Sequence, residues 1–222
     1  MPIRIPPSQE REDPTVEDLS DNLAEEFIKA AHQIAAHGLV CCGSGNLSRR
    51  ISRDRMLVTA RSAWMEDLRE EQVALCDIRD GRCINRMEPS IEIGLHRAVL
   101  SKREDIDVVL HFQSPYATAL ACSKKVETNL YVIPEVPYHI GPVAAIPYMT
   151  PGSEELAEAA GAAMAGHNVA ILGNHGEVTV GKDFREAIQR ALFFELACTI
   201  LFKAGDQATR LSQRDVASLQ AI

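Results

Sequence analysis

The chain has 222 residues, of which 46% are apolar and 24% are charged, and its formal net charge is −8. This balance is typical of a single globular domain with a sizeable core. A strongly acidic chain is repelled by nucleic acid and anionic membranes, and no run of about 18 apolar residues could span a bilayer. Neither nucleic acid nor a membrane is therefore an expected partner.

The chain divides into three expected parts. Residues 1–16 are rich in proline and charge, lack the apolar segment of a secretory signal, and are expected to form a disordered arm. Residues 17–205 are expected to form the domain, and residues 206–222 a short amphipathic helix or a mobile tail. None of the six cysteines has C-x-x-C spacing, so we expect reduced thiols in a cytoplasmic protein.

The first half of the chain predicts one helix followed by short strands. Helical periodicity runs from Leu19 to Ile34, with Thr15 and Asp18 as a capping box and Gly38 as the stop. Strands are predicted over 47–51, 56–59 and 73–78, and Asp80–Gly81 indicates a hairpin before 82–84.

The second half predicts helices that alternate with strands. Ser90 is expected to cap a helix from Ile91 to Val99, and Ser153 a helix that ends near Gly166. Further helices are predicted over 116–123 and 184–203, strands over 107–112, 169–172 and 178–180, and an extended segment over 131–147. Helices flanking a sheet of short strands indicate a layered α/β or α+β domain.

Four residues carry the strongest chemical pattern. His111 lies near the end of one predicted strand, His175 follows another, and Glu92 and His96 are one helical turn apart. Histidine and carboxylate ligands suit divalent zinc, manganese, iron or cobalt. A hydrogen bond from His96 is expected rather than metal ligation.

The loop 43–48, with two glycines, offers backbone and side-chain donors that suit an anion.

Four short motifs in this order resemble the class II aldolase/adducin family. They are Gly45-Asn46-Leu47-Ser48, Pro89-Ser90-Ile91-Glu92, His111-x-Gln113-Ser114-Pro115 and Asn174-His175-Gly176. The resemblance extends over residues 23–203. It implies a three-layer α/β/α sandwich with a largely antiparallel central sheet. It also implies a homotetramer with active sites at subunit interfaces, a divalent metal and a sugar phosphate as substrate.

The resemblance also assigns roles to individual residues. Glu92 would be the catalytic acid/base and a metal ligand at rest, and His111 and His175 would hold the metal. The candidates for binding the substrate phosphate either carry hydrogen-bond donors or let the backbone come close to the phosphate. They are Gly45, Asn46, Ser48, Thr59, Arg61 and Ser90. A proton donor from a neighbouring subunit could be any of Tyr116, Tyr131, Tyr138 and Tyr148.

Three positions depart from the family pattern. Gln113 stands where a histidine ligand is expected, and its neutral amide oxygen is a weaker zinc ligand than imidazole. Either Gln113 or His139 would complete the metal shell. Ile91 replaces a serine and cannot donate to phosphate, and the segment 59–62 departs from T-x-S-G. Arg61 could restore the lost contact, because a guanidinium binds phosphate or carboxylate bidentately.

The resulting prediction is metal-dependent, reversible aldol cleavage of a ketose 1-phosphate resembling fuculose 1-phosphate, giving dihydroxyacetone phosphate and an aldehyde. The expected metal is Zn²⁺, with Mn²⁺ or Mg²⁺ as alternatives. A decarboxylase of a keto or hydroxy acid on the same fold is the second hypothesis. A catalytically silent, adducin-like assembly module is the third.

Overall fold

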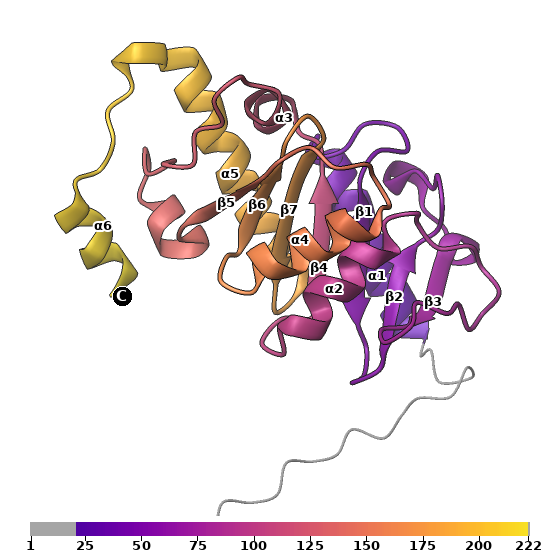
Figure 1. Ribbon diagram of the computed structural model, residues 1–222. Helices are drawn as coiled ribbons and strands as arrows, with labels where there is room; N and C mark the ends of the chain where they lie inside the picture. The colour runs from indigo at the N-terminus through magenta and orange to yellow at the C-terminus, as the bar shows by residue number, and fades with distance from the viewer. Residues whose placement is uncertain (1–20, 222) are drawn as a thin grey trace, which may run out of the picture.

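The computed structural model describes residues 21–221, and the predicted arm and the capping box at Thr15 lie outside that range. Seven strands form one sheet in the order β3-β2-β1-β4-β7-β6-β5 (Figure 1). The strands are β1 (Asn46–Arg50), β2 (Arg55–Thr59), β3 (Val73–Asp77), β4 (Val108–Phe112), β5 (Val143–Ile146), β6 (Val169–Leu172) and β7 (Gly176–Gly181). Every neighbouring pair is antiparallel except β5–β6, which is parallel.

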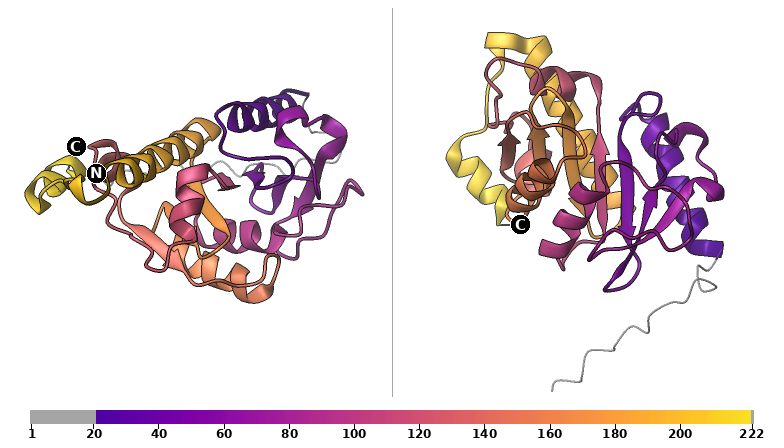
Figure 2. Two further views of the ribbon diagram at one scale, coloured as in Figure 1. Left: turned by 90° about the horizontal axis from the view of Figure 1, so that it is seen from above. Right: turned by 45° about the vertical axis from the view of Figure 1, so that its right-hand side comes forward.

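Helices cover both faces of the sheet and confirm the expected three-layer sandwich (Figure 2). One apolar core lies between the sheet and α1 (Asp21–Ala36), α3 (Pro115–Ala121) and α5 (Phe184–Ala204). A second core lies between the opposite face and the helices α2 (Ile93–Lys102) and α4 (Glu154–Met164). The short helix α6 (Gln213–Gln220) follows a turn of 3-10 helix, Gly205–Gln207.

Strand β4 shows how the sequence directs side chains to the two faces. Val108, Leu110 and Phe112 pack into the core beneath α5, whereas Val109 packs into the core beneath α2 and α4. Successive side chains of a strand point to opposite faces, so His111 lies on the same side as Val109. The alternation therefore places this imidazole on the α2 side of the sheet.

The helix ends follow local chemistry, with one shift in position. The Ser153 hydroxyl accepts a hydrogen bond from the Leu156 amide, and the Asp183 carboxylate accepts one from the Glu186 amide. Helix α2 begins at Ile93, two residues later than predicted, because Glu92 occupies its N-cap with φ −91° and ψ 14°. The Ser90 hydroxyl instead accepts a hydrogen bond from the Glu92 amide at 3.3 Å.

Residues 131–147 were predicted to be extended, and this was only partly correct. They contain a turn of π-helix, Val136–Ile140, and then strand β5. The predicted strand over 82–84 is reduced to one bridge between Cys76 and Cys83. No helix within residues 21–221 has the length and apolar character needed to cross a bilayer.

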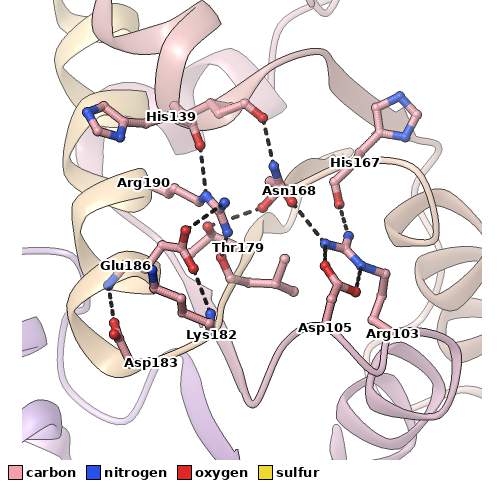
Figure 3. Close-up of polar contacts among 12 residues, drawn as sticks. Arg103, Asp105, His139, His167, Asn168, Thr179, Lys182, Asp183, Glu186 and Arg190 are labelled. Carbon is pink, nitrogen blue, oxygen red and sulfur yellow. Dashed lines mark hydrogen bonds and ion pairs between the residues drawn. The ribbon is translucent and has the colours of Figure 1, made fainter. Parts of the chain in front are cut away.

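Two arginines tie the elements together where β4 begins and β7 ends (Figure 3). Arg103 donates to the Met164 carbonyl at 2.9 Å, and Arg190 donates to the carbonyls of His139 and Val180 at 2.8 and 2.7 Å. These bonds satisfy helix-end and strand-end carbonyls that would otherwise lack partners. The network lies at the opposite end of the strands from His111.

Candidate metal and active site

Three elements bring Glu92, His111 and His175 together. Glu92 caps α2, His111 lies near the end of β4, and His175 lies in the tight turn between β6 and β7. The turn places Asn174 in the left-handed region at φ 53° and is closed by a bond from the His175 amide to the Leu172 carbonyl. A rigid strand or helix end therefore positions each of the three side chains.

The carboxylate of Glu92 lies between the two imidazoles. Its Oε2 is 3.3 Å from His111 Nε2, and its Oε1 is 3.5 Å from His175 Nε2. The side chains of Glu92 and His111 are only 6% and 1% exposed, which leaves little water to compete for their polar atoms. The two rings are 4.7 Å apart between centroids and tilted by 60°.

Hydrogen bonding fixes which nitrogen of His111 faces Glu92. His111 Nδ1 lies 2.9 Å from the Glu177 carbonyl oxygen, which can only accept, so Nδ1 carries the proton. In the neutral ring Nε2 then has a free lone pair directed toward Glu92. This arrangement, with one nitrogen bound to a backbone carbonyl, is the usual support of a metal-binding histidine.

A second layer of hydrogen bonds holds Glu92 from the strand side. Asn46 is opposite His111 in the β1–β4 ladder, and its Nδ2 donates to Glu92 Oε2 at 2.9 Å. Its Oδ1 must then accept from His96 Nε2, which lies 2.5 Å away. The other ring nitrogen, Nδ1, accepts from the Ser48 hydroxyl at 2.6 Å. The chain Ser48–His96–Asn46–Glu92 thus orients the carboxylate.

The site's electrostatics lower the pKa of Glu92, of His96 and of His175. Burial raises the pKa of Glu92, but His111, the Asn46 hydrogen bond and His175 outweigh it and leave the pKa below its ordinary value. Burial lowers the pKa of His96 to about 3. Burial, followed by the proximity of His111, also lowers the pKa of His175.

The donor set fits a divalent metal ion. One ligand atom each from Glu92, His111 and His175 lie within 4.8 Å of one another. Within this cluster, Glu92 Oε1 is buried without a hydrogen-bond partner. Two imidazoles and a carboxylate are ligands that Zn²⁺ and Mn²⁺ accept.

A cavity of about 320 Å³ lies over this cluster, within the range of small-molecule sites. It is lined by residues of the glycine loop, the segment after β2 and the three central side chains. Of the phosphate candidates, Gly45, Asn46, Arg61 and Ser90 line it, together with Gln113. Arg61 also pairs with Glu88 at 2.7 Å, and both side chains are more than half exposed.

Two phosphate candidates are buried away from the lining. Ser48 is fully buried against His96, and Thr59 accepts a hydrogen bond from the Leu47 amide at 3.2 Å. Neither is among the residues that line the cavity. Within the described residues, none of the four tyrosines lines it either.

The two candidates for completing the metal shell are placed differently. Gln113 lines the cavity, and its Nε2 donates to the His175 carbonyl at 2.6 Å, which reserves its other amide atom, Oε1, as an acceptor. His139 instead lies beside Arg190, to which its carbonyl is bonded (Figure 3). Its ring stacks on Phe193 with 5.2 Å between the ring centroids. The geometry thus brings Gln113, and not His139, to the three central residues.

Sequence reasoning missed two features of the site. It named Asn46 only as a candidate for the substrate phosphate, and did not foresee that its side-chain amide also holds Glu92 and His96. It also gave no role to the Glu177 backbone, which orients His111 across β4 and β7. No motif signals the backbone contact, because only strand pairing creates it.

Comparison with known proteins supplies the family. Residues 25–202 match the family described as Class II Aldolase and Adducin N-terminal domain. The chain belongs to this class II aldolase/adducin family. The order of its four motifs and its sandwich fold agree with that membership.

Several relatives within the class II aldolase/adducin family differ in the reaction they are named for. The chain is 28% identical over 200 residues to 3-oxo-tetronate 4-phosphate decarboxylase of Haemophilus influenzae, covering 88% of this chain and 95% of that protein. It is 33% identical over 162 residues to L-fuculose phosphate aldolase of Methanococcus maripaludis, covering 72% of this chain and 85% of that protein. The crystal structure of YgbL from Klebsiella pneumoniae is similar with a TM-score of 0.84, 27% identity, and coverage of 89% and 97%.

Proposed function

We propose that this protein is a metal-dependent carbon–carbon lyase that decarboxylates a phosphorylated 3-oxo acid of the 3-oxo-tetronate 4-phosphate type. The carrying observation is the position of Glu92 between the Nε2 atoms of His111 and His175, at 3.3 and 3.5 Å, beneath a small cavity. Retention of this cluster favours an enzyme over a silent assembly module. The sequence alone placed aldol cleavage first, and the decarboxylases among the relatives support placing decarboxylation first instead.

The choice of reaction rests on how much of the chain each group of relatives matches. Decarboxylases of 3-oxo-tetronate 4-phosphate match 88% and 91% of the chain, in Haemophilus influenzae and Escherichia coli K12. The aldolases match at somewhat higher identity, 31% and 33%, but over only 78% and 72% of it. That identity keeps aldol cleavage of a ketose 1-phosphate as the second candidate.

The two reactions share their difficult step. Loss of the carboxyl group from a 3-oxo-tetronate 4-phosphate leaves an electron pair on C2, next to the C3 carbonyl. Cleavage of a ketose 1-phosphate between C3 and C4 leaves the pair on the corresponding carbon. In both reactions the product is dihydroxyacetone phosphate once this carbon takes a proton. A divalent metal held by Glu92, His111 and His175 would supply charge stabilisation to the enediolate.

The chain's own residues would do the rest. Glu92 would carry the proton to or from the reacting carbon, because its carboxylate is buried, oriented by Asn46, and next to the metal ligands. The substrate phosphate would be bound by the backbone of Gly45, the Ser90 hydroxyl and Arg61, which line one cavity. Ile91, which lines the same cavity and is 51% exposed, offers no donor there.

Gln113 would be the fourth protein ligand, through the Oε1 atom left as an acceptor by its bond to His175. An amide oxygen in place of imidazole weakens preference for Zn²⁺ relative to Mn²⁺ or Mg²⁺. We keep Zn²⁺ as the first metal to test, with Mn²⁺ and Mg²⁺ beside it. A homotetramer with sites at its interfaces is proposed from the family, and light scattering on the purified protein would test it.

The first experiment follows hydrogen exchange on dihydroxyacetone phosphate in heavy water. Proton NMR would detect deuterium entering the hydroxymethyl carbon with each added metal, and a chelator would serve as control. We expect metal-dependent exchange, since both candidate reactions need this enediolate. Metal binding without exchange would refute the proposed chemistry.

A second measurement separates the two candidates. Release of CO₂ from 3-oxo-tetronate 4-phosphate would be compared with release of aldehyde from fuculose 1-phosphate at equal enzyme and metal. We expect the first to be faster. Aldehyde release alone would establish the aldolase reaction instead.

A further inference from the structure

Next to the cavity, the chain carries two adjacent cysteines that the proposed chemistry does not use. Cys41 and Cys42 are exposed, and their sulfur atoms lie 3.7 Å apart. Cys41 begins a turn closed by two reciprocal bonds: its amide donates to the Ser44 hydroxyl and its carbonyl accepts from the Ser44 amide, both at 3.1 Å. The turn leads directly into Gly45 and Asn46.

We propose that Cys41 and Cys42 form a reversible modification site, which a hydroperoxide closes to a disulfide between neighbouring residues and so displaces the loop 43–46 that lines the cavity. The chemistry balances with the peroxide as oxidant. One thiolate attacks the O–O bond and becomes a sulfenic acid, releasing water or an alcohol. The second thiol then displaces water from that sulfur and forms the S–S bond.

The two sulfur atoms already lie in contact, and either thiol can be oxidised first with the other as the resolving thiol. The hydrogen bond with Cys41 is the main factor that raises the pKa of the Cys42 thiol. Closure must shorten the 3.7 Å separation to a bond of about 2.05 Å.

Closure must also change the backbone. Adjacent Cα atoms are about 3.8 Å apart, shorter than the 4.4–6.8 Å that disulfides usually span, so the ring is strained. Cys42 already lies in the left-handed region at φ 54°, and the ring would have to rotate the peptide joining the two cysteines. A strained, exposed disulfide is easily reduced, which makes the modification reversible.

The loop has little freedom to absorb this movement. A Cβ atom on Gly45 would lie 2.6 Å from Val40 and 2.7 Å from the His111 carbonyl oxygen. On the preceding side, the Leu39 carbonyl accepts from the Gln113 amide at 2.9 Å. A shift of the turn would therefore reach β4 and Asn46, the residue that orients Glu92.

The single tryptophan reports on this loop independently of activity. Trp64 is the chain's only tryptophan, and a Cβ atom on Gly43 would lie 3.6 Å from its indole ring. Its side chain is 48% exposed, so movement of the loop would change its solvent contact. Tryptophan fluorescence can therefore follow the turn without any substrate.

The test treats the metal-loaded full chain with hydrogen peroxide and then reverses the reaction with dithiothreitol. We expect a mass lower by about 2 Da, from loss of two hydrogens, and a peptide with Cys41 linked to Cys42. Trp64 fluorescence should shift. Exchange on dihydroxyacetone phosphate should fall on the order of tenfold or more, because small displacements of catalytic groups are costly. All four effects should reverse.

Two variants make the result specific. Cys42→Ser should form no internal disulfide and show no fluorescence change, while Cys122→Ser, which removes another exposed thiol, should behave as the wild type. Linkage of Cys41 to Cys122 or to a second chain would overturn the proposal, as would an internal disulfide without the fluorescence and exchange changes. The exchange arm rests on the proposed function. If the reduced protein shows no exchange, that function fails, and mass and fluorescence still decide the disulfide.

Discussion

Replacing His96 by glutamine tests whether the ring is neutral in the folded protein. The ring is fully buried, and both nitrogens are bonded, to Asn46 and to Ser48. Burial lowers its pKa from 6.5 to about 3. Between these two pH values the imidazole is protonated in the unfolded chain but neutral in the native chain. This contribution to stability is complete above pH 6.5 and is lost as pH falls toward 3.

The size of the effect follows from proton linkage. Each pH unit between the two pKa values costs about 1.4 kcal/mol, so lowering the pH from 6 to 4 should remove about 2 to 3 kcal/mol. Glutamine cannot take up this proton. His96→Gln should be less stable at pH 7 by about 1 to 3 kcal/mol, since its amide fits the two partners imperfectly. The difference from wild type should then shrink as the pH falls.

Urea unfolding, followed by circular dichroism at pH 7, 6, 5 and 4, would give the free energy of unfolding of the wild type and of His96→Gln at each pH. Carboxylates titrate in both proteins, so their contributions cancel in the difference. His37→Gln is the matched control, because that residue is exposed. Parallel curves for wild type and His96→Gln would refute the neutral, doubly bonded ring and with it the direction of the bond to Asn46.

Three further outcomes are expected. Glu92→Gln should keep the fold but reduce hydrogen exchange on dihydroxyacetone phosphate, measured by NMR, at least about 100-fold. The reason is that an amide cannot carry the proton. Unimpaired exchange would show that Glu92 has no part in the mechanism. A metal ion at 100 times its Kd should raise the free energy of unfolding by about 2.7 kcal/mol, which would be measured as a higher Tm. A chelator should abolish this increase in Tm, and His111→Asn should not show it. Gly45→Ala should cost more stability in urea than Gly38→Ala. Both glycines have positive φ, 74° and 71°, but only Gly45 is crowded, so equal losses would refute the crowding argument.

Sequence by itself determined the elements whose signals are local. The capping residue Ser153 located a helix start, and the apolar run over 107–112 located the strand that contains His111. The ordered motifs around Glu92, His111 and His175 supplied the fold class before any coordinates. The contact predicted for His96 was of the right kind, a hydrogen bond rather than ligation.

Tertiary structure alone decided how these residues meet. The register of β1 on β4 sets Asn46 opposite His111, and this places its side-chain amide between Glu92 and His96. The same packing gathers Arg61 and Gln113 around one cavity and buries Ser48 beneath it. Such partners are dozens of residues apart, and no local pattern fixes their pairing. Burial then sets the charge of each group, because the pKa of a side chain depends on what surrounds it in the fold.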